Sequence, residues 1–248
     1  TLRGWLAWHR GDAPAALAAC ERAGPYAMNG TATLLSVDLR LLWALAALRT
    51  AAQAEATVRE ALLAQAQGLR EQLAAWAAFA PANVAHKLAL VDAELARLRN
   101  EPLVAWQAYE RAMALSDQSA YLHDQGLCAE CAGDFFATQN ASEARRLALY
   151  RAYRCYLRWG ATAVVHAFLQ RHPNLAAEAG AARIDDVDEL AIDVNEKLLR
   201  LFDTFGVGRA SVWLDGTKTV LVGQRRGDEP LQVSRHVVSD QGLTALPD

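Results

Sequence analysis

Two cysteines three positions apart, Cys128 and Cys131, with His123 shortly before them, carry the most reactive chemistry in this sequence. Thiolates at this spacing lie on one helix face, where they could bind zinc or exchange a disulfide bond. A structural zinc site needs four ligands, and no second cysteine pair follows. A thioredoxin-like site needs a strand before the helix, which the surrounding helical pattern does not offer. We therefore predict buried, unreactive cysteines, and we expect neither a metal nor a cofactor.

Arginines in one helical stretch are a second group that could have a function. Some of them share a face of the expected helix, so an acidic partner peptide could lie along it. The alternative is a solvated face on which arginines pair with local acids such as Glu143. We favour the solvated face and keep as candidates for partner binding Arg145, Arg151, Arg154 and Arg158.

Motifs of the common enzyme classes are missing. The sequence has no glycine-rich phosphate loop ending in Lys-Ser/Thr, no kinase catalytic loop and no Gly-x-Ser-x-Gly elbow. Histidines are scattered, and we interpret His86 and His166 as packing or capping residues. The aromatic side chains fall at helical spacing, which favours core packing over a ligand box. They are Trp106, Tyr109, Phe135, Phe136, Tyr150, Tyr153, Tyr156 and Trp159.

Composition favours a helical protein of the cytoplasm. Of 248 residues, 53% are hydrophobic, and much of that fraction is alanine, which suits closely packed helices. A net charge of −3 gives no reason to expect a nucleic acid or an anionic membrane as partner. The four cysteines are too few and too scattered for a disulfide framework, and the first residues do not have the pattern of a leader, so we expect no secretion signal. The chain begins without methionine, so we expect a piece of a longer protein.

Apolar periodicity predicts the helices that must position these residues. The apolar run Leu34–Leu48 contains two charges and is too short to span a bilayer, so we predict a buried helix there. A second helix is expected to end at Gly24-Pro25. In the longest helix the expected buried stripe is Val58, Leu62, Leu69, Leu73 and Trp76. The predicted helices before Pro81 cover residues 2–9, 15–22, 33–48 and 55–78.

Between Pro81 and Pro173 the helical period is interrupted only by short polar breaks. These breaks leave room for tight turns alone, so neighbouring helices must run antiparallel and pack together. Turns near Asn100 and Asn140 have similar surroundings, which predicts a repeated helical hairpin. We expect the stack to end near Pro173. The predicted breaks are residues 100–102, 116–117 and 139–142.

After Pro173 the pattern changes. Residues 174–188 are rich in Ala, Gly and acids and predict a linker. An amphipathic helix is expected from Leu190 to Phe205. Two strand-like runs, 209–214 and 219–222, then flank Asp215-Gly216, which predicts a β-hairpin.

Several short sequences resemble the tetratricopeptide-like region of very large bacterial signalling proteins. They are Phe79-Ala80-Pro81-Ala82-Asn83, His86-Lys87, Glu94-Leu95-Ala96-Arg97, Tyr109-Glu110-Arg111-Ala112, Tyr156-Leu157-Arg158-Trp159-Gly160-Ala161 and His172-Pro173. In that family a serine/threonine-kinase-like domain and an AAA-type ATPase precede the helical region, and a GAF sensor and a histidine kinase or another output domain follow it. The family's catalytic motifs do not occur in this segment, so no catalytic residue is carried over.

The stretch from Leu201 to Leu214 resembles the opening of a GAF domain, which begins with a long helix, a short loop and an antiparallel hairpin. About 60 residues from Asp188 onward are fewer than a usual small domain has, so we expect an incomplete GAF-like segment. The alternative is a forkhead-associated domain, because Val233-Ser234-Arg235-His236 is similar to its phosphopeptide loop. The spacing from serine to histidine is wrong for that family.

Together these observations predict a mainly α protein: a tetratricopeptide-like α-α superhelix over residues 1–173, a linker over 174–188 and an α+β, GAF-like segment over 189–248. The expected function is a non-catalytic regulatory segment that relays signals between an ATPase or kinase region and a sensor or output region. Alternatives are a free-standing peptide-binding adaptor and part of an active sensor histidine kinase. The expected partners are a protein, a peptide or flanking domains of the same chain. A homodimer through residues 189–248 is also expected, because two strands alone cover little of an apolar helix.

Overall fold

The computed structural model describes residues 2–27, 33–119, 121–175, 209–214, 219–224, 232–239 and 242–245. The chain forms two compact units, Thr1–Ala176 and Ala177–Asp248. Helices make up the first unit, and the described residues of the second are strands. The prediction of a mainly helical protein built from stacked hairpins is thereby confirmed for the first unit.

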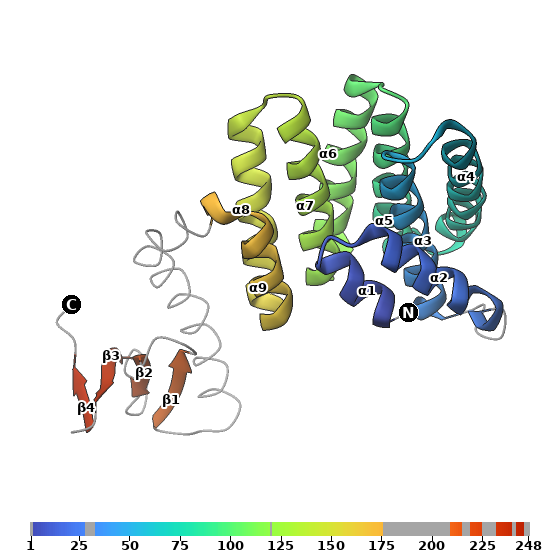
Figure 1. The fold of residues 1–248 in the computed structure, drawn as a ribbon. Helices are drawn as coiled ribbons and strands as arrows, with labels where there is room; N and C mark the ends of the chain where they lie inside the picture. Colours follow the sequence, from blue (N-terminus) through green and yellow to red (C-terminus); the bar gives the residue numbers. More distant parts are fainter. Residues whose placement is uncertain are drawn as a thin grey trace. The chain divides into compact units, whose positions relative to one another are not determined.

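Consecutive helices of the first unit pack as antiparallel neighbours (Figure 1). The predicted helices at 2–9, 33–48 and 55–78 are confirmed, as are the breaks at 100–102 and 139–142. The described helices are α1 (Leu2–His9), α2 (Ala13–Ala27), α3 (Leu34–Ala51), α4 (Ala56–Phe79), α5 (Pro81–Leu98), α6 (Pro102–Ser119), α7 (Leu122–Thr138), α8 (Ser142–Trp159) and α9 (Thr162–Arg171).

Three hairpin turns share one backbone geometry. Each has one residue in the left-handed region: Gly11 (φ 81°), Asn100 (φ 61°) or Asn140 (φ 56°). Glycine and asparagine adopt this conformation more easily than other residues do. In each turn the next backbone N–H donates to a carbonyl five residues earlier, which closes the end of the first helix. The three bonds run from Asp12 to Ala7 (2.9 Å), Glu101 to Ala96 (3.0 Å) and Ala141 to Phe136 (3.1 Å).

The stack curves enough for its first helix, α1, to contact α9 (Figure 1). Trp8 of α1 is buried under the guanidinium of Arg49 of α3, which lies 5.0 Å from the indole ring centre. His9 meets the ring of Tyr156 of α8 edge-on, at 5.8 Å between ring centres. Side chains therefore fill the inner side of the curve, which in an open helical repeat would be a groove.

Close helix packing depends on two glycines of α7. A Cβ atom on Gly126 would lie 2.5 Å from the ring of Tyr156, and one on Gly133 would lie 2.6 Å from Leu149. Both contacted side chains belong to α8. The glycines thus let α8 approach α7 closely enough for the Tyr156 hydroxyl to reach inside the stack.

Buried charges join the inner helices α3, α5 and α7. Lys87 of α5, whose side chain is 3% exposed, bonds to Asp124 of α7 and to Asp38 of α3 (2.9 Å). The His86 Nε2 atom lies 2.8 Å from the same Asp124 carboxylate. Burial alone would raise the pKa of Asp124, but the hydrogen bond from His86 and the charge of Lys87 outweigh it and lower this pKa to about 2. Lys87 thus joins three helices, because it bonds to Asp38 of α3 and to the ionised Asp124 of α7.

Two further acids of α7 bind other helices. Glu130 accepts a hydrogen bond from the Tyr156 hydroxyl of α8 (2.7 Å) and forms an ion pair with Arg171 of α9. Burial would raise the Glu130 pKa, but His172, Arg171 and Tyr156 lower it to about 2. Asp134 accepts from Arg49 of α3 at 2.7 Å. The helix α7 therefore contacts an oppositely charged or hydrogen-bonding group on each of α3, α5, α8 and α9.

Two predicted helix ends and one predicted buried residue are wrong. Helix α2 continues through Pro25 to Ala27, because a proline so close to the end of a helix removes few hydrogen bonds. Helix α6 continues through Ser116, whose hydroxyl donates to the Met113 carbonyl (2.8 Å) inside the helix. In α4, Leu69 and Leu73 are buried as predicted, but Val58 is exposed.

The expected end of the stack near Pro173 is only partly right. Helix α9 ends at Arg171, but residues 173–175 are helical again. Proline fits the first position of a helix because its missing N–H has no partner there. The rest of the predicted linker and the predicted helix from Leu190 to Phe205 lie outside the described residues.

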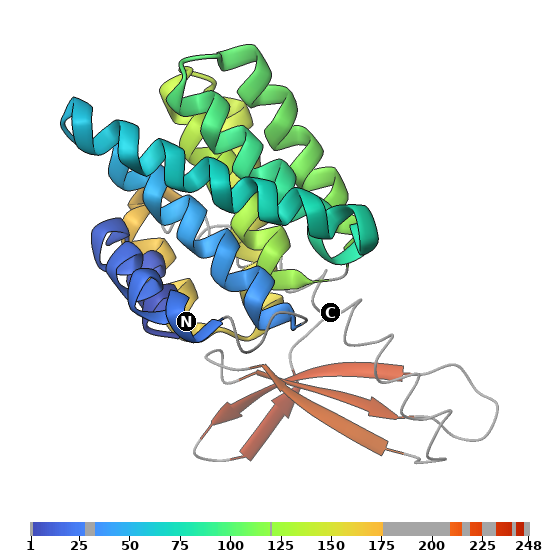
Figure 2. The same ribbon diagram turned by 90° about the vertical axis from the view of Figure 1, so that its right-hand side faces the viewer.

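The described part of the second unit is an antiparallel sheet (Figure 2). The predicted hairpin is confirmed: β1 (Arg209–Leu214) pairs with β2 (Thr219–Gln224), with Val212 opposite Leu221. Two strands were not predicted, β3 (Gln232–Ser239) and β4 (Gly242–Ala245), and the order is β1-β2-β3-β4. Val233–His236 therefore lies in a strand and not in a phosphopeptide loop. The prediction of a dimer rested on a segment with only two strands. The described sheet has four strands, so this premise is wrong, and dimerisation stays a prediction.

Removing the charge of Asp124 should destabilise the first unit strongly. The substitution Asp124→Asn keeps the size of the side chain but leaves Lys87 buried without its main counter-charge. We expect the free energy of unfolding in urea, followed by circular dichroism, to fall by about 3 kcal/mol. The control Glu143→Gln, in the exposed Glu143–Arg146 pair, should change it by less than about 1 kcal/mol. Equal effects of the two substitutions would contradict a stabilising role for the buried cluster.

Candidate functional site: a groove between α4, α5 and α6

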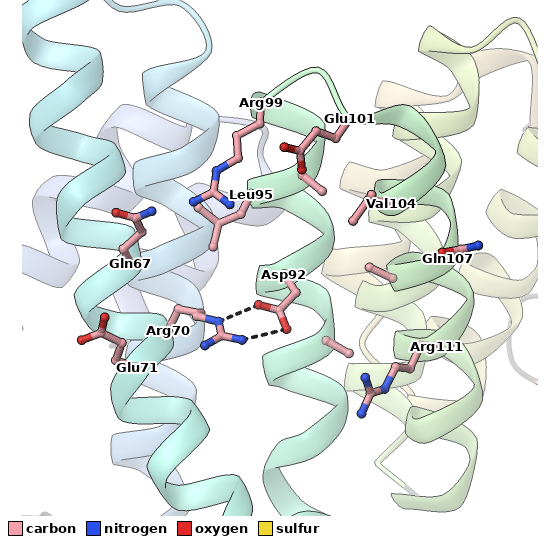
Figure 3. Close-up of a pocket in the computed structure, with 13 residues that line it drawn as sticks. Gln67, Arg70, Glu71, Asp92, Leu95, Arg99, Glu101, Val104, Gln107 and Arg111 are labelled. Carbon is pink, nitrogen blue, oxygen red and sulfur yellow. Dashed lines mark hydrogen bonds and ion pairs between the residues drawn. The ribbon is translucent and has the colours of Figure 1, made fainter.

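A groove of about 770 Å³ lies between α4 and α6, with α5 between them (Figure 3). It forms because α4 and α6 are the second helices of successive hairpins, and both pack against α5. The lining residues are Gln67, Arg70, Glu71, Ala89, Asp92, Leu95, Ala96, Arg99, Glu101, Val104, Gln107, Ala108 and Arg111.

The rim of the groove is polar and its charges balance. Arg70 of α4 binds the Asp92 carboxylate of α5 with both nitrogens, at 2.7 Å and 3.4 Å (Figure 3). This hydrogen bond is the main reason why the pKa of Arg70 is raised. The other charged lining residues are Glu71, Arg99, Glu101 and Arg111. Three arginines against three acids leave the groove without net charge, which suits a neutral or mixed-charge ligand.

Two exposed amides are among the lining residues, Gln67 on α4 and Gln107 on α6 (Figure 3). An amide carries both a donor and an acceptor, as a peptide group does. Val104 and small residues such as Ala89 and Ala108 give apolar contact area. This combination of balanced charges, amide groups and a small apolar surface suits an extended peptide better than a charged metabolite.

Few lining residues of the groove belong to the types common in catalytic sites. Among them there is no serine, threonine, cysteine, lysine or histidine. The side chains that could act as a base or a nucleophile are the carboxylates of Glu71, Asp92 and Glu101. Asp92 is paired with Arg70, and the other two are exposed. The geometry supports binding.

The cysteines lie where the sequence predicted them. Cys128 and Cys131 are both buried and free. Burial raises the pKa of Cys128 to about 12 and that of Cys131 well above its ordinary value. His123 is 37% exposed and packs on the ring of Trp159, at 5.4 Å between ring centres. In the described part of the chain, no three His, Cys, Asp or Glu side chains gather as a metal site.

The candidate arginines do not form one continuous exposed surface. Arg151 forms an ion pair with Asp117 and donates to the Met113 carbonyl, so it joins α8 to α6. Arg145 and Arg154 are half-buried, whereas Arg158 is exposed. An exposed neighbour, Arg146, pairs with Glu143, which agrees with the prediction of a solvated face on which arginines pair with local acids. Partner binding at Arg145, Arg151, Arg154 and Arg158 stays a prediction.

The prediction of core aromatics is confirmed for most of the set. Tyr109, Phe135, Phe136, Tyr153 and Tyr156 are buried, and Trp106 packs partly buried against Phe135 and Phe136, whereas Trp159 is 43% exposed.

The histidines were interpreted less well than the aromatics. His86 is buried beside the ring of Tyr121, in line with packing, but it is also a partner of Asp124, and His166 is exposed.

The sequence analysis missed the groove and the buried ion pairs. The groove residues come from three helices and share no motif. The ion pairs had one signal: Lys87 and Glu94 interrupt an otherwise apolar face of α5 between Val84 and Leu95. A charged residue on an apolar face indicates a buried partner elsewhere in the chain.

Comparisons of the chain with protein-family models, with curated proteins and with solved structures found no match. Among the described helices, none has the length and apolarity that crossing a membrane would require. The function must therefore follow from the geometry of the chain itself.

The buried thiols should resist modification in the native protein. Their raised pKa values and their burial leave almost no accessible thiolate at pH 8, so a bulky maleimide should label Cys128 and Cys131 at least about a hundred times more slowly than in urea. Mass spectrometry of labelled peptides measures both sites. Rapid labelling of both in the native protein, or one zinc ion per chain in a metal assay, would contradict the buried, metal-free assignment.

Proposed function

We propose that the chain is a non-catalytic regulatory and interaction segment of a bacterial signal-transduction protein. In this proposal it connects an ATPase or kinase region to a sensor or output region in the cytoplasm. The resemblance of the helical hairpins to the tetratricopeptide-like region of large signalling proteins supports this assignment. The single observation that carries it is the groove between α4, α5 and α6, which offers a mixed polar and apolar binding surface built from three helices.

A stiff arm is the mechanical part of the proposed role. Ion pairs of Asp124, Glu130 and Asp134 tie α7 to α3, α5 and α9, and the closely packed α8 adds the Tyr156 hydrogen bond. Because Asp124 and Glu130 are buried, bending the stack would separate their charges from the partners, which costs free energy. Such a unit transmits a displacement at one end to the other without absorbing it.

The groove is the binding part of the proposed role. An extended segment of a partner or of a flanking domain would place its peptide groups between Gln67 and Gln107 and a small apolar side chain against Val104. The balanced rim excludes strongly charged segments by giving them no net attraction. The filled inner side of the stack favours this outer groove over the inner face for docking.

A free-standing peptide-binding adaptor is the second candidate, and the same groove favours it. The two candidates differ in whether the occupant belongs to the same chain. In either case the GAF-like assignment of the second unit is part of the proposal, and the antiparallel β1–β2 hairpin supports it.

Blocking the groove should abolish peptide binding without affecting the fold. Peptides selected from a random library against the purified chain should bind the variant Val104→Arg at least about tenfold more weakly, because the side chain fills the groove and adds an uncompensated charge. The matched control is Leu147→Arg on α8. The side chains of Val104 and Leu147 are exposed, at 52% and 60%, so both variants should fold.

Two results would count against the proposed groove. Selected peptides that bind Val104→Arg and the parent chain equally would place the interaction surface elsewhere. Loss of binding in Leu147→Arg alone would place it on α8, near the arginines considered from the sequence.

A further inference from the structure

A second cavity, of about 800 Å³, lies where α3 and α5 end and α2 and α4 begin. Its wall includes Gly11 and Pro14 from the start of the second helix, Thr50 from the last turn of α3 and Asn100 from the turn after α5. It shares no lining residue with the groove between α4, α5 and α6.

Three guanidinium groups reach this cavity: Arg49, Arg59 and Arg97. The acids near them are Glu94, which lines the cavity, and Asp134, which binds Arg49 at 2.7 Å. Glu94 lies 3.5 Å from both Arg49 and Arg97. A third carboxylate, Asp12, lies at the start of α2 between the lining residues Gly11 and Ala13 and accepts from the Ala15 N–H at 3.0 Å. The three arginines therefore face the cavity from α3, α4 and α5, on the side away from Asp12.

Some buried donors in the wall have no acceptor. Within the described residues, the Nε atom of Arg49 and the hydroxyl of Thr50 are buried and make no hydrogen bond. Arg49 Nη2 and Glu94 Oε1 also lack one, but they lie 3.5 Å apart and satisfy each other after a small movement. Buried donors without an acceptor are unfavourable. Arg49 Nε and Thr50 Oγ1 therefore indicate an acceptor that enters from the cavity.

The backbone around the cavity has both signs of partial charge. Helix α2 begins there, but the carboxylate of Asp12 already caps its N-terminal end by accepting from the Ala15 N–H at 3.0 Å. Helices α3 and α5 end there, and their carbonyl groups disfavour an anion. Arg59 covers the α5 end by donating to the Leu98 carbonyl at 2.9 Å. The favourable place for an anion is thus on the side of Arg49 and Thr50.

We propose that this cavity binds a phosphoryl group. A tetrahedral phosphoryl offers three oxygens, which can accept from Arg49, from Thr50 and from a nitrogen of Arg59 or Arg97 at the same time. Planar carboxylate offers two oxygens and leaves one of these donors unused. The phosphoryl group can belong to a small phosphate ester or to a phosphorylated side chain. This site does not depend on the proposed function of the chain.

The test is the thermal unfolding midpoint of the full chain at increasing inorganic phosphate, with sodium chloride at matched ionic strength. Phosphate should raise the midpoint of the parent with a saturable dependence, because it binds the folded state alone. Two substitutions remove one donor each, Arg59→Gln and Thr50→Val. Each should weaken the apparent affinity for phosphate, by about tenfold for the arginine and by about threefold for the threonine.

The control Arg111→Gln removes an arginine from the groove between α4, α5 and α6 and should leave the phosphate response unchanged. Circular dichroism in chloride shows whether each variant is folded, and Thr50→Val, which keeps the side-chain shape, preserves the test if Arg59→Gln unfolds.

A repeat with N-acetyl-phosphoserine amide distinguishes the two sources of the phosphoryl group. Tighter binding than inorganic phosphate identifies a phosphorylated side chain, and weaker binding identifies a free phosphate compound. No saturable shift beyond the chloride control, or equal responses of Arg59→Gln, Thr50→Val and Arg111→Gln, would overturn the proposal.

Discussion

Burying a carboxylate inside a helical stack is tolerated only where a cation or a hydrogen-bond donor reaches it, and α7 buries two of them. Asp124 meets Lys87 and His86, and Glu130 meets Arg171 and Tyr156. A third, partly buried acid of α7, Asp134, meets Arg49. Apolar contacts alone would let neighbouring hairpins slide along each other at little cost. Because each charge must stay within reach of its partner, the ion pairs fix the positions of α3, α5 and α9 along α7.

This constraint also decides where ligands can bind. The curve of the stack brings α1 against α9, so aromatic and charged side chains such as Trp8, His9 and Arg49 fill the inner side. Binding surface then remains on the outer side, in the groove between α4, α5 and α6, and at the helix ends, in the cavity beside Arg49 and Thr50. The first has its charges spread along a polar rim, whereas the second gathers three arginines beside buried donors without an acceptor, so the two surfaces suit different ligands.

Local signals predicted the helices well, whereas contacts between distant residues could not be predicted. Apolar periodicity located α1, α3 and α4, and asparagines at 100 and 140 marked the repeated turn. Pro25 and Ser116 were misjudged because their effect depends on position within the helix and on a hydrogen bond to Met113. Lys87 and Asp124 are 37 positions apart, and no local pattern specifies which acid a buried lysine meets. The groove and the cavity were missed for the same reason, since each is assembled from separate helices.

The central claim, that buried and ionised carboxylates of α7 hold the hairpins together, is tested most directly by an NMR titration of the side-chain carboxyl carbons. Asp124 and Glu130 should titrate near pH 2, below their ordinary pKa values of 3.8 and 4.5. Since these pKa values are lowered in the folded state, the stability they contribute is present above about pH 4.5 and is lost as the pH falls toward 2. Midpoints near pH 4 for both groups, with the fold intact below them, would show that their charges do not stabilise the stack and would contradict this account.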